Sequence, residues 1–148
     1  MEQIKIPINE ASPNAKSGAD FASHSASNQN AGVTEIVLSH NSAQGGYELV
    51  LPMLAHQSRN CEDRWFTWVA PENVSKALLQ QYDFDLRKVR LIHTKSDIET
   101  LWVLWDALHN GNSSMVVGSL REISSSDCAK LEDAACQGDT QGLLLRVR

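Results

Sequence analysis

The sequence contains little cysteine, few aromatic residues and no long apolar segment. Its three cysteines, Cys61, Cys128 and Cys136, sit at no metal-ligand spacing and cannot all pair with one another, which favours free thiols in a reducing compartment. No apolar run approaches the roughly 20 residues that a membrane helix needs, and the N-terminus lacks a signal-peptide pattern. We therefore expect a cytoplasmic protein that has no membrane-spanning segment.

Positive charge is also scarce. The formal net charge is -5 and the pI is about 5.5, which argues against nucleic acid or a membrane surface as the main partner. A chain of 148 residues, 42% of them hydrophobic, can build one core, since domains typically run to about 100–150 residues. Composition thus predicts a single domain and no nucleic-acid partner.

The N-terminal part lacks large apolar side chains. Residues 9–31 are mostly Ala, Ser and Asn, and Phe21 is their one large apolar residue. Such a segment cannot bury enough surface to offset its conformational entropy. We predict a disordered tail over residues 1–31 and a folded domain over residues 32–148.

Within the predicted domain, short apolar runs alternate with segments of helical periodicity. The runs are residues 33–38, 65–70, 89–93, 115–120 and 143–147, and the helical segments are about 44–58, 72–82, 97–110 and 125–137. The second and fourth runs are apolar on both faces, as in strands buried on both sides. This alternation predicts an α/β domain with a mostly parallel sheet of about five strands and helices on both faces, in three layers.

Capping residues indicate where the last two helices begin. Ser96 with Glu99 forms an S-x-x-E capping box, and Ser124 with Asp127 caps the next helix similarly. An apolar stripe follows at helical spacing in the first of these helices. We expect this stripe to face the core: Ile98, Leu101, Trp102, Trp105 and Leu108.

The loop after the first strand lacks the residues of a phosphate-binding loop. Its "SHNSAQGGYE" offers Gly45 and Gly46 but no following Lys and Ser or Thr, and Glu48 places negative charge where phosphate would bind. No strand ends in an acidic residue placed to hold magnesium. We predict no nucleotide, cofactor or metal site.

Catalytic patterns are missing as well. The five histidines are scattered, there is no G-x-S-x-G elbow, and no cysteine has a flanking sequence that marks a nucleophile. His40 and His93 follow strands, where open α/β sheets bind ligands, but two such residues are common by chance. We predict a protein that is not an enzyme.

Two cations precede neighbouring apolar runs. Arg64 comes just before the second run and Lys88 just before the third, so both lie at the N-terminal edge if these strands are neighbours in a parallel sheet. Arg and Trp are favoured anchors of protein interfaces. The alternative is that Trp65 and Trp68 belong to the core and that Arg87 and Lys88 are solvated.

Several longer stretches resemble the SulA cell-division inhibitors of the bacterial SOS response. They are "LPMLAHQ", "RWFTWVAP", "LRKVRLIH", "ALHNGNSSMVVGSL" and "LEDAACQGDTQGLLLR", and the resemblance spans about residues 32–147. It implies a fold similar to the RecA ATPase core without the phosphate loop. This implication agrees with the missing lysine.

The resemblance also implies a partner and a mechanism. SulA proteins are made after DNA damage and bind FtsZ, the tubulin-like GTPase of the division ring. They occupy the surface by which FtsZ subunits join, so polymerisation stops, GTPase activity falls and septation halts. The family's functional positions fall on Arg64, Val69 and Lys88, and its Trp in the following helix falls on Leu78, which keeps an apolar contact but loses the indole.

Other partners and functions follow from the resemblance or compete with it. Family members can carry a C-terminal tail ending in histidine that Lon protease recognises, whereas this sequence stops at Arg148, so Lon would have to use another segment. An exposed sheet edge and the family both make a homodimer possible. The alternative functions are a degenerate RecA-like adaptor in DNA repair or translesion synthesis, and a nucleotide hydrolase with an unorthodox loop.

Overall fold

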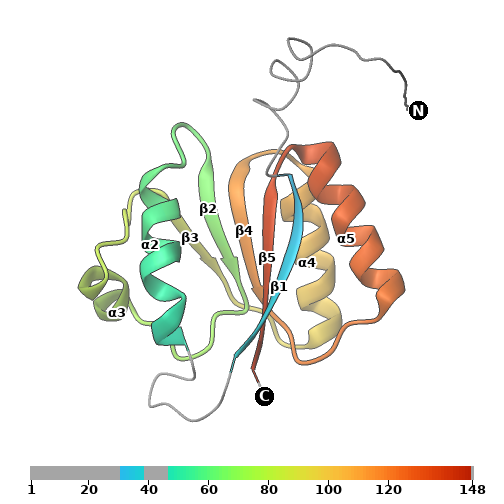
Figure 1. Cartoon of the computed structure of the whole chain (residues 1–148), viewed down its shortest axis with the longest axis horizontal. Coiled ribbons are helices and arrows are strands. Elements are labelled where there is room, and N and C mark those ends of the chain that lie inside the picture. The colour runs from blue at the N-terminus through green and yellow to red at the C-terminus, as the bar shows by residue number, and fades with distance from the viewer. Residues whose placement is uncertain (1–30, 39–46, 148) are drawn as a thin grey trace, which may run out of the picture.

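The protein is built on a five-stranded parallel sheet. In the computed structural model, which describes residues 31–38 and 47–147, the strands are β1 (Gly32–Leu38), β2 (Trp65–Val69), β3 (Val89–Ile92), β4 (Ser113–Ser119) and β5 (Gln141–Val147). Their order is β1-β5-β4-β2-β3, and all neighbouring pairs are parallel (Figure 1). The α/β class and the number of strands predicted from the sequence are confirmed.

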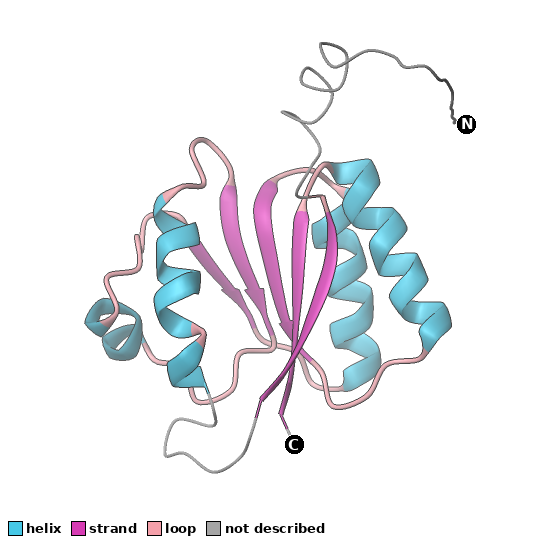
Figure 2. Cartoon of the chain, viewed as in Figure 1, coloured by secondary structure: helices cyan, strands magenta, loops and turns pink. Residues whose placement is uncertain are grey.

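Helices cover both faces of this sheet (Figure 2). They are α2 (Leu51–Arg59), α3 (Lys76–Gln81), α4 (Asp97–His109) and α5 (Ser125–Gly138), and a short 3-10 helix, η1 (Tyr47–Leu49), precedes α2. Core residues of α2 and α3 form one apolar cluster, and those of α4 and α5 form another. The predicted three layers are therefore present.

Part of the predicted organisation lies outside the described residues. This applies to residues 1–30 of the predicted tail and to the 39–46 loop, with His40, Gly45 and Gly46. Among the helices that are described, none has both the length and the apolar character needed to span a membrane.

The first predicted helix begins later than its apolar pattern suggests. Residues 47–49 form the 3-10 turn, and α2 starts at Leu51 with Pro52 in its first turn. A proline is tolerated there because the first N–H groups of a helix have no partner within it. Leu51 and Leu54 are then fully buried beneath α2, so Pro52 restarts the helix as expected.

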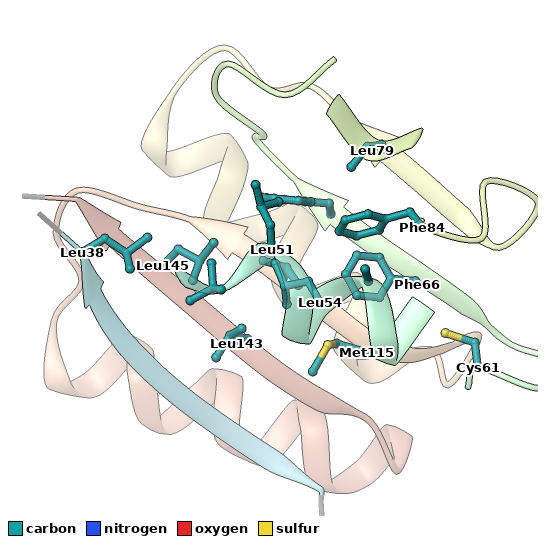
Figure 3. Packing of buried hydrophobic residues seen from close by; sticks show 14 residues of the cluster. Leu38, Leu51, Leu54, Cys61, Phe66, Leu79, Phe84, Met115, Leu143 and Leu145 are labelled. Atoms are coloured by element: carbon teal, nitrogen blue, oxygen red, sulfur yellow. The ribbon is translucent and has the colours of Figure 1, made fainter. Parts of the chain in front are cut away.

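The fully buried core on the α2 side joins residues of β1, β2, β4 and β5 (Figure 3), and the partly buried Val89 and Leu91 of β3 pack against it. Phe66 and Phe84 meet edge to face, with ring centroids 5.9 Å apart, and Trp68 is fully buried among them. Burying one such side chain contributes about 1.5–3 kcal/mol. The cluster comprises Leu38, Val50, Leu51, Leu54, Ala55, Cys61, Phe66, Trp68, Leu79, Phe84, Met115, Val117, Leu143 and Leu145.

Side-chain caps fix the starts of α4 and α5 where the sequence predicts them. Ser96 Oγ accepts the Glu99 N–H at 3.1 Å, and Ser124 Oγ accepts the Asp127 N–H at 3.0 Å. These bonds satisfy N–H groups that lack a partner within the helix. At the other end of α5, Gly138 is the last helical residue, as expected.

The predicted core face of α4 is mostly wrong. Ile98 is 72% exposed, Trp102 69% and Trp105 37%, and of the predicted stripe only Leu108 is fully buried. The helix instead buries Thr100, Leu104, Ala107 and Leu108.

Close packing against β4 explains this rotation of α4. A Cβ on Gly118 would lie 2.5 Å from Leu104 Cδ2, so the helix sits directly on a strand position that has no side chain. Such a short separation leaves room for small and aliphatic residues but not for an indole ring. The tryptophans are therefore on the outer side of the helix.

Candidate partner-binding surface

Arg64 and Lys88 lie at the same edge of the sheet. β2 and β3 are parallel neighbours, with Phe66 opposite Val89, and the Phe66 N–H donates to the Lys88 carbonyl over 2.8 Å. Both cations thus stand where the strands begin, opposite the carboxyl ends at which open α/β sheets bind ligands. The placement expected from the sequence is present in the structure.

Arg64 connects this edge to the ends of α4 and α5. Its Nη1 donates to the Asp139 carbonyl at 3.0 Å and to the Gly111 carbonyl at 3.5 Å. Asp139 is the left-handed C-cap of α5, and Gly111 follows α4 with φ 76°. A cation beside carbonyls at helix C-termini is stabilising. The guanidinium is held in place, and the rest of its five N–H donors remain for other acceptors.

Lys88 fixes the turn that leads into β2. Its Nζ donates to the carbonyl of Glu62, whose φ of 58° is left-handed. The turn is closed further by the Arg64 N–H, which donates to the Cys61 carbonyl at 3.0 Å. An ammonium group has three donors, so one bond to the protein still leaves Lys88 able to bind a partner.

A neighbouring ion pair lies in the loop before β3. Arg87 Nε and Asp85 Oδ1 are 3.1 Å apart, and the Arg87 side chain is 89% exposed. The hydrogen bond from Arg87 lowers the pKa of Asp85 below its usual value and raises the pKa of Arg87. An exposed pair contributes little to stability. Lys88, the next residue, forms no ion pair with the described residues, so its charge is not neutralised by a carboxylate of this loop.

Val69 lies at the other end of β2 and is fully buried. It belongs to the cluster under α4 and α5, where Leu104 and Val116 are among its neighbours. A side chain without exposed surface cannot touch a partner while the domain is folded. Of the two roles that the sequence leaves open, contact or support from beneath, the structure permits support.

Leu78 lies on α3, on the opposite face of the sheet from Val69. It is half-buried and packs against the α2-side core. Its N–H donates to Ser75 Oγ at 3.1 Å, which caps α3. The structure thus brings Arg64 and Lys88 to one edge and places Val69 and Leu78 elsewhere.

Two further side chains lie beside the cations: Trp65, which the sequence pattern named with a core position as its alternative, and Arg90, which it did not name. Trp65 is 41% exposed, which corrects its interpretation as a core residue, whereas Trp68 is buried as expected. The Arg90 guanidinium lies over the Trp65 ring, 5.5 Å from its centroid. The alternation of "VRLI" indicates that Arg90 and Leu91 face opposite ways, but not that Arg90 meets an aromatic ring.

The carboxyl edge of the sheet bears a polar cavity of about 600 Å³. His93, Lys95 and Arg121 are among its lining residues, together with Glu72 and Asp97. In the described ranges, no three His, Cys, Asp or Glu side chains are grouped to hold a metal ion. The three cysteines are free thiols.

Comparison with known proteins identifies the family. A model described as cell division inhibitor SulA matches residues 31–142. The cell division inhibitor SulA of Serratia marcescens is 33% identical over 100 residues, which cover 67% of this chain and 58% of that protein. The protein of the same name from Yersinia enterocolitica is 32% identical over 115 residues, covering 77% of this chain and 67% of the relative.

A solved structure agrees with this match. SulA from Pseudomonas aeruginosa superimposes with a TM-score of 0.72 at 26% identity, over 78% of this chain and 98% of that one. The matched part of this chain spans less than two thirds of the Serratia relative. The family is described by inhibition rather than by a reaction, in agreement with the expectation of no enzyme. Together with the five-stranded parallel fold, these matches show that the chain belongs to the SulA family of cell division inhibitors.

Proposed function

We propose that this protein inhibits cell division by binding FtsZ in the cytoplasm during the SOS response to DNA damage. The bound inhibitor blocks addition of the next FtsZ subunit. Polymerisation then stops, GTPase activity falls because the active site is completed between subunits, and septation halts. Family membership supports the inhibitory function. The location of the binding surface rests on one observation: Arg64 and Lys88 lie at the same edge of the sheet.

The local geometry suits stoichiometric binding. Arg64 and Lys88 are each anchored to backbone carbonyls, so little side-chain entropy is lost when a partner binds. Their remaining donors can reach acidic or carbonyl groups on FtsZ. A standard interface buries about 800 Å² per partner, which one edge of a domain of this size can provide.

The two other family positions take indirect or peripheral roles in this proposal. Val69 is buried and supports the sheet behind the surface. Leu78 is half-buried on α3 and provides an apolar contact at the margin. We therefore assign most of the binding free energy to Arg64 and Lys88.

Sedimentation of FtsZ with GTP tests the proposal. We expect loss of polymer near one inhibitor per FtsZ, whereas strongly substoichiometric inhibition would indicate capping of filament ends. Arg64→Ala and Lys88→Ala should each cost about 2 kcal/mol, or roughly 25-fold in affinity.

The matched control is Arg121→Ala, which removes an exposed cation at the opposite, carboxyl edge of the sheet. It should inhibit like the wild type. Thermal unfolding of each variant separates loss of contact from loss of fold, because Arg64 also bonds to the protein itself. Wild-type potency in folded Arg64→Ala and Lys88→Ala proteins would show that these residues are not the anchors.

A further inference from the structure

The α4-side face of the sheet carries a row of polar residues, Arg90, Thr67 and Ser113, that the family positions do not include. Trp65, Thr67 and Val69 point to this face because side chains alternate along β2, and Arg90 on β3 lies opposite Thr67 in the register. α4 packs against β4 and β2, and α5 against β1 and β5. At the β3 end, Trp65 remains 41% exposed.

Arg90 is fixed from two sides but is not satisfied as a donor. Its Nη2 donates to Thr67 Oγ1 at 3.3 Å, and Thr67 Oγ1 in turn lies 2.7 Å from Ser113 Oγ. Its Nε–H is buried and has no hydrogen-bond acceptor among the residues that the structure describes. Most buried polar groups in native proteins are paired, and an unpaired one is costly. A partner cannot reach this buried Nε–H in the folded domain, so a carboxylate would have to bind the other N–H groups of the half-buried guanidinium.

Trp65 gives this cation a defined orientation. The guanidinium lies over the indole face at 5.5 Å, within the range of a cation–π interaction. Arg and Trp are enriched among residues that dominate interface energetics. A planar guanidinium held over an indole can present a fork of donors to one carboxylate, which a mobile lysine cannot do.

This pair continues the surface formed by the two edge cations. Trp65 directly follows Arg64, and Arg90 lies two residues after Lys88 along β3. The chain is acidic overall, with a formal charge of -5, yet four cations lie where β2 and β3 begin, Arg64, Arg87, Lys88 and Arg90, of which Arg87 is paired with Asp85. Charge complementarity favours an acidic partner segment at this place.

We propose that Arg90, stacked on Trp65, is a further contact residue for the partner bound at Arg64 and Lys88, and that it binds a carboxylate of an acidic segment of that partner. This inference rests on the proposed function and extends its surface from the edge onto the face of β3. The partner's carboxylate binds N–H groups of the half-buried guanidinium other than the buried Nε–H, while the Trp65 ring provides apolar contact beside it.

Arg90→Met tests this assignment because its two expected effects have opposite signs. Methionine retains the unbranched stem on Trp65 but removes the charge and the unpaired Nε–H. We expect unfolding in urea at an equal or higher midpoint, together with about tenfold weaker FtsZ binding in calorimetry or fluorescence anisotropy. The remaining binding should depend less steeply on salt.

Two variants complete the experiment. Arg121→Met makes the same replacement at the carboxyl edge and should bind FtsZ as the wild type does. Arg90→Lys keeps the charge without the planar fork, and we expect a loss smaller than tenfold. If Arg90→Met does not fold, the FtsZ affinity of Arg90→Lys still tests the role of Arg90.

The outcomes distinguish this inference from the proposed function. Wild-type affinity and salt dependence in folded Arg90→Met, or in Arg90→Lys if only that variant folds, would overturn the role of Arg90 while FtsZ binding stands. If the wild-type protein fails to bind FtsZ, the proposed function is wrong and this inference falls with it.

Discussion

Replacing Gly138 with alanine tests how closely the ends of α4 and α5 approach one another. A Cβ at this position would lie 2.0 Å from the Leu108 carbonyl oxygen and 3.1 Å from that of His109. Normal contact distances are about 3.5 Å, so the two helix ends would have to separate by roughly 1.5 Å. The obstacle is backbone, which cannot rotate away as a side chain can.

The size of the effect follows from three contributions. Overpacking costs about 1–3 kcal/mol. Separating the helix ends also strains the buried Thr140 hydroxyl, which donates to the Leu108 and Gly138 carbonyls at 3.1 and 3.0 Å, and such a bond contributes about 1 kcal/mol. Replacing glycine by alanine also stabilises the helix itself by up to about 1 kcal/mol, because alanine has the higher helix propensity. We expect a net loss of about 2–3 kcal/mol.

Equilibrium unfolding in urea measures this loss, and thermal unfolding should show a decrease in Tm of roughly 10 °C. Gln137→Ala, at the exposed preceding residue of α5, is the matched control and should stay within about 0.5 kcal/mol of the wild type. An unchanged midpoint for Gly138→Ala would refute the close approach of the helix ends. The variant should also weaken FtsZ binding, because the Asp139 carbonyl that holds Arg64 directly follows Gly138.

Two further predictions concern titratable groups. Because the folded pKa of Asp85 is lowered from 3.8 by Arg87, the associated stabilisation is present above that value and is lost as the pH falls through the folded pKa. Arg87→Ala should therefore be slightly less stable than the wild type in urea at about pH 7 and equal to it at about pH 2; a difference that persists in acid would contradict this cause. In thiol labelling followed by mass spectrometry, Cys61, 2% exposed, should react only on unfolding. Cys136 is exposed and should react in the native state. Its reaction should be slower than that of a fully solvated thiol, because partial desolvation raises the pKa of Cys136. Equal native rates for the two would argue against the packing around Cys61.

Much of the fold could be predicted because its determinants are local. Ser96 and Ser124 fix the starts of α4 and α5 through bonds within four residues, and strands buried on both faces have a distinctive apolar pattern. The orientation of α4 could not be predicted in this way. Both of its sides are apolar, and a contact distant in sequence, Leu104 on Gly118, decides which side faces the sheet.

The candidate surface likewise has features that the sequence predicts and features that depend on contacts distant in sequence. The shared edge of Arg64 and Lys88 follows from the parallel direction of the strands, which alternation predicts, whereas the adjacency of β2 and β3 is only a condition of that prediction. The acceptors of Arg64 could not be predicted in this way, because the Gly111 and Asp139 carbonyls lie beside Arg64 only once the ends of α4 and α5 have packed together. The stacking of Arg90 on Trp65 likewise depends on a diagonal pair across two strands, which periodicity within one strand cannot reveal.

The position of β5 determines when this protein can fold during synthesis. β5 lies between β1 and β4, and in the described sheet it is the strand with which β1 pairs. The first strand to leave the ribosome must therefore wait for the last one, since residue 32 pairs with residue 141. Long-range pairings of this kind form late. In a nascent chain that ends before β5, β1 has no partner strand in the described sheet, so the five-stranded sheet is completed only after β5 has been made.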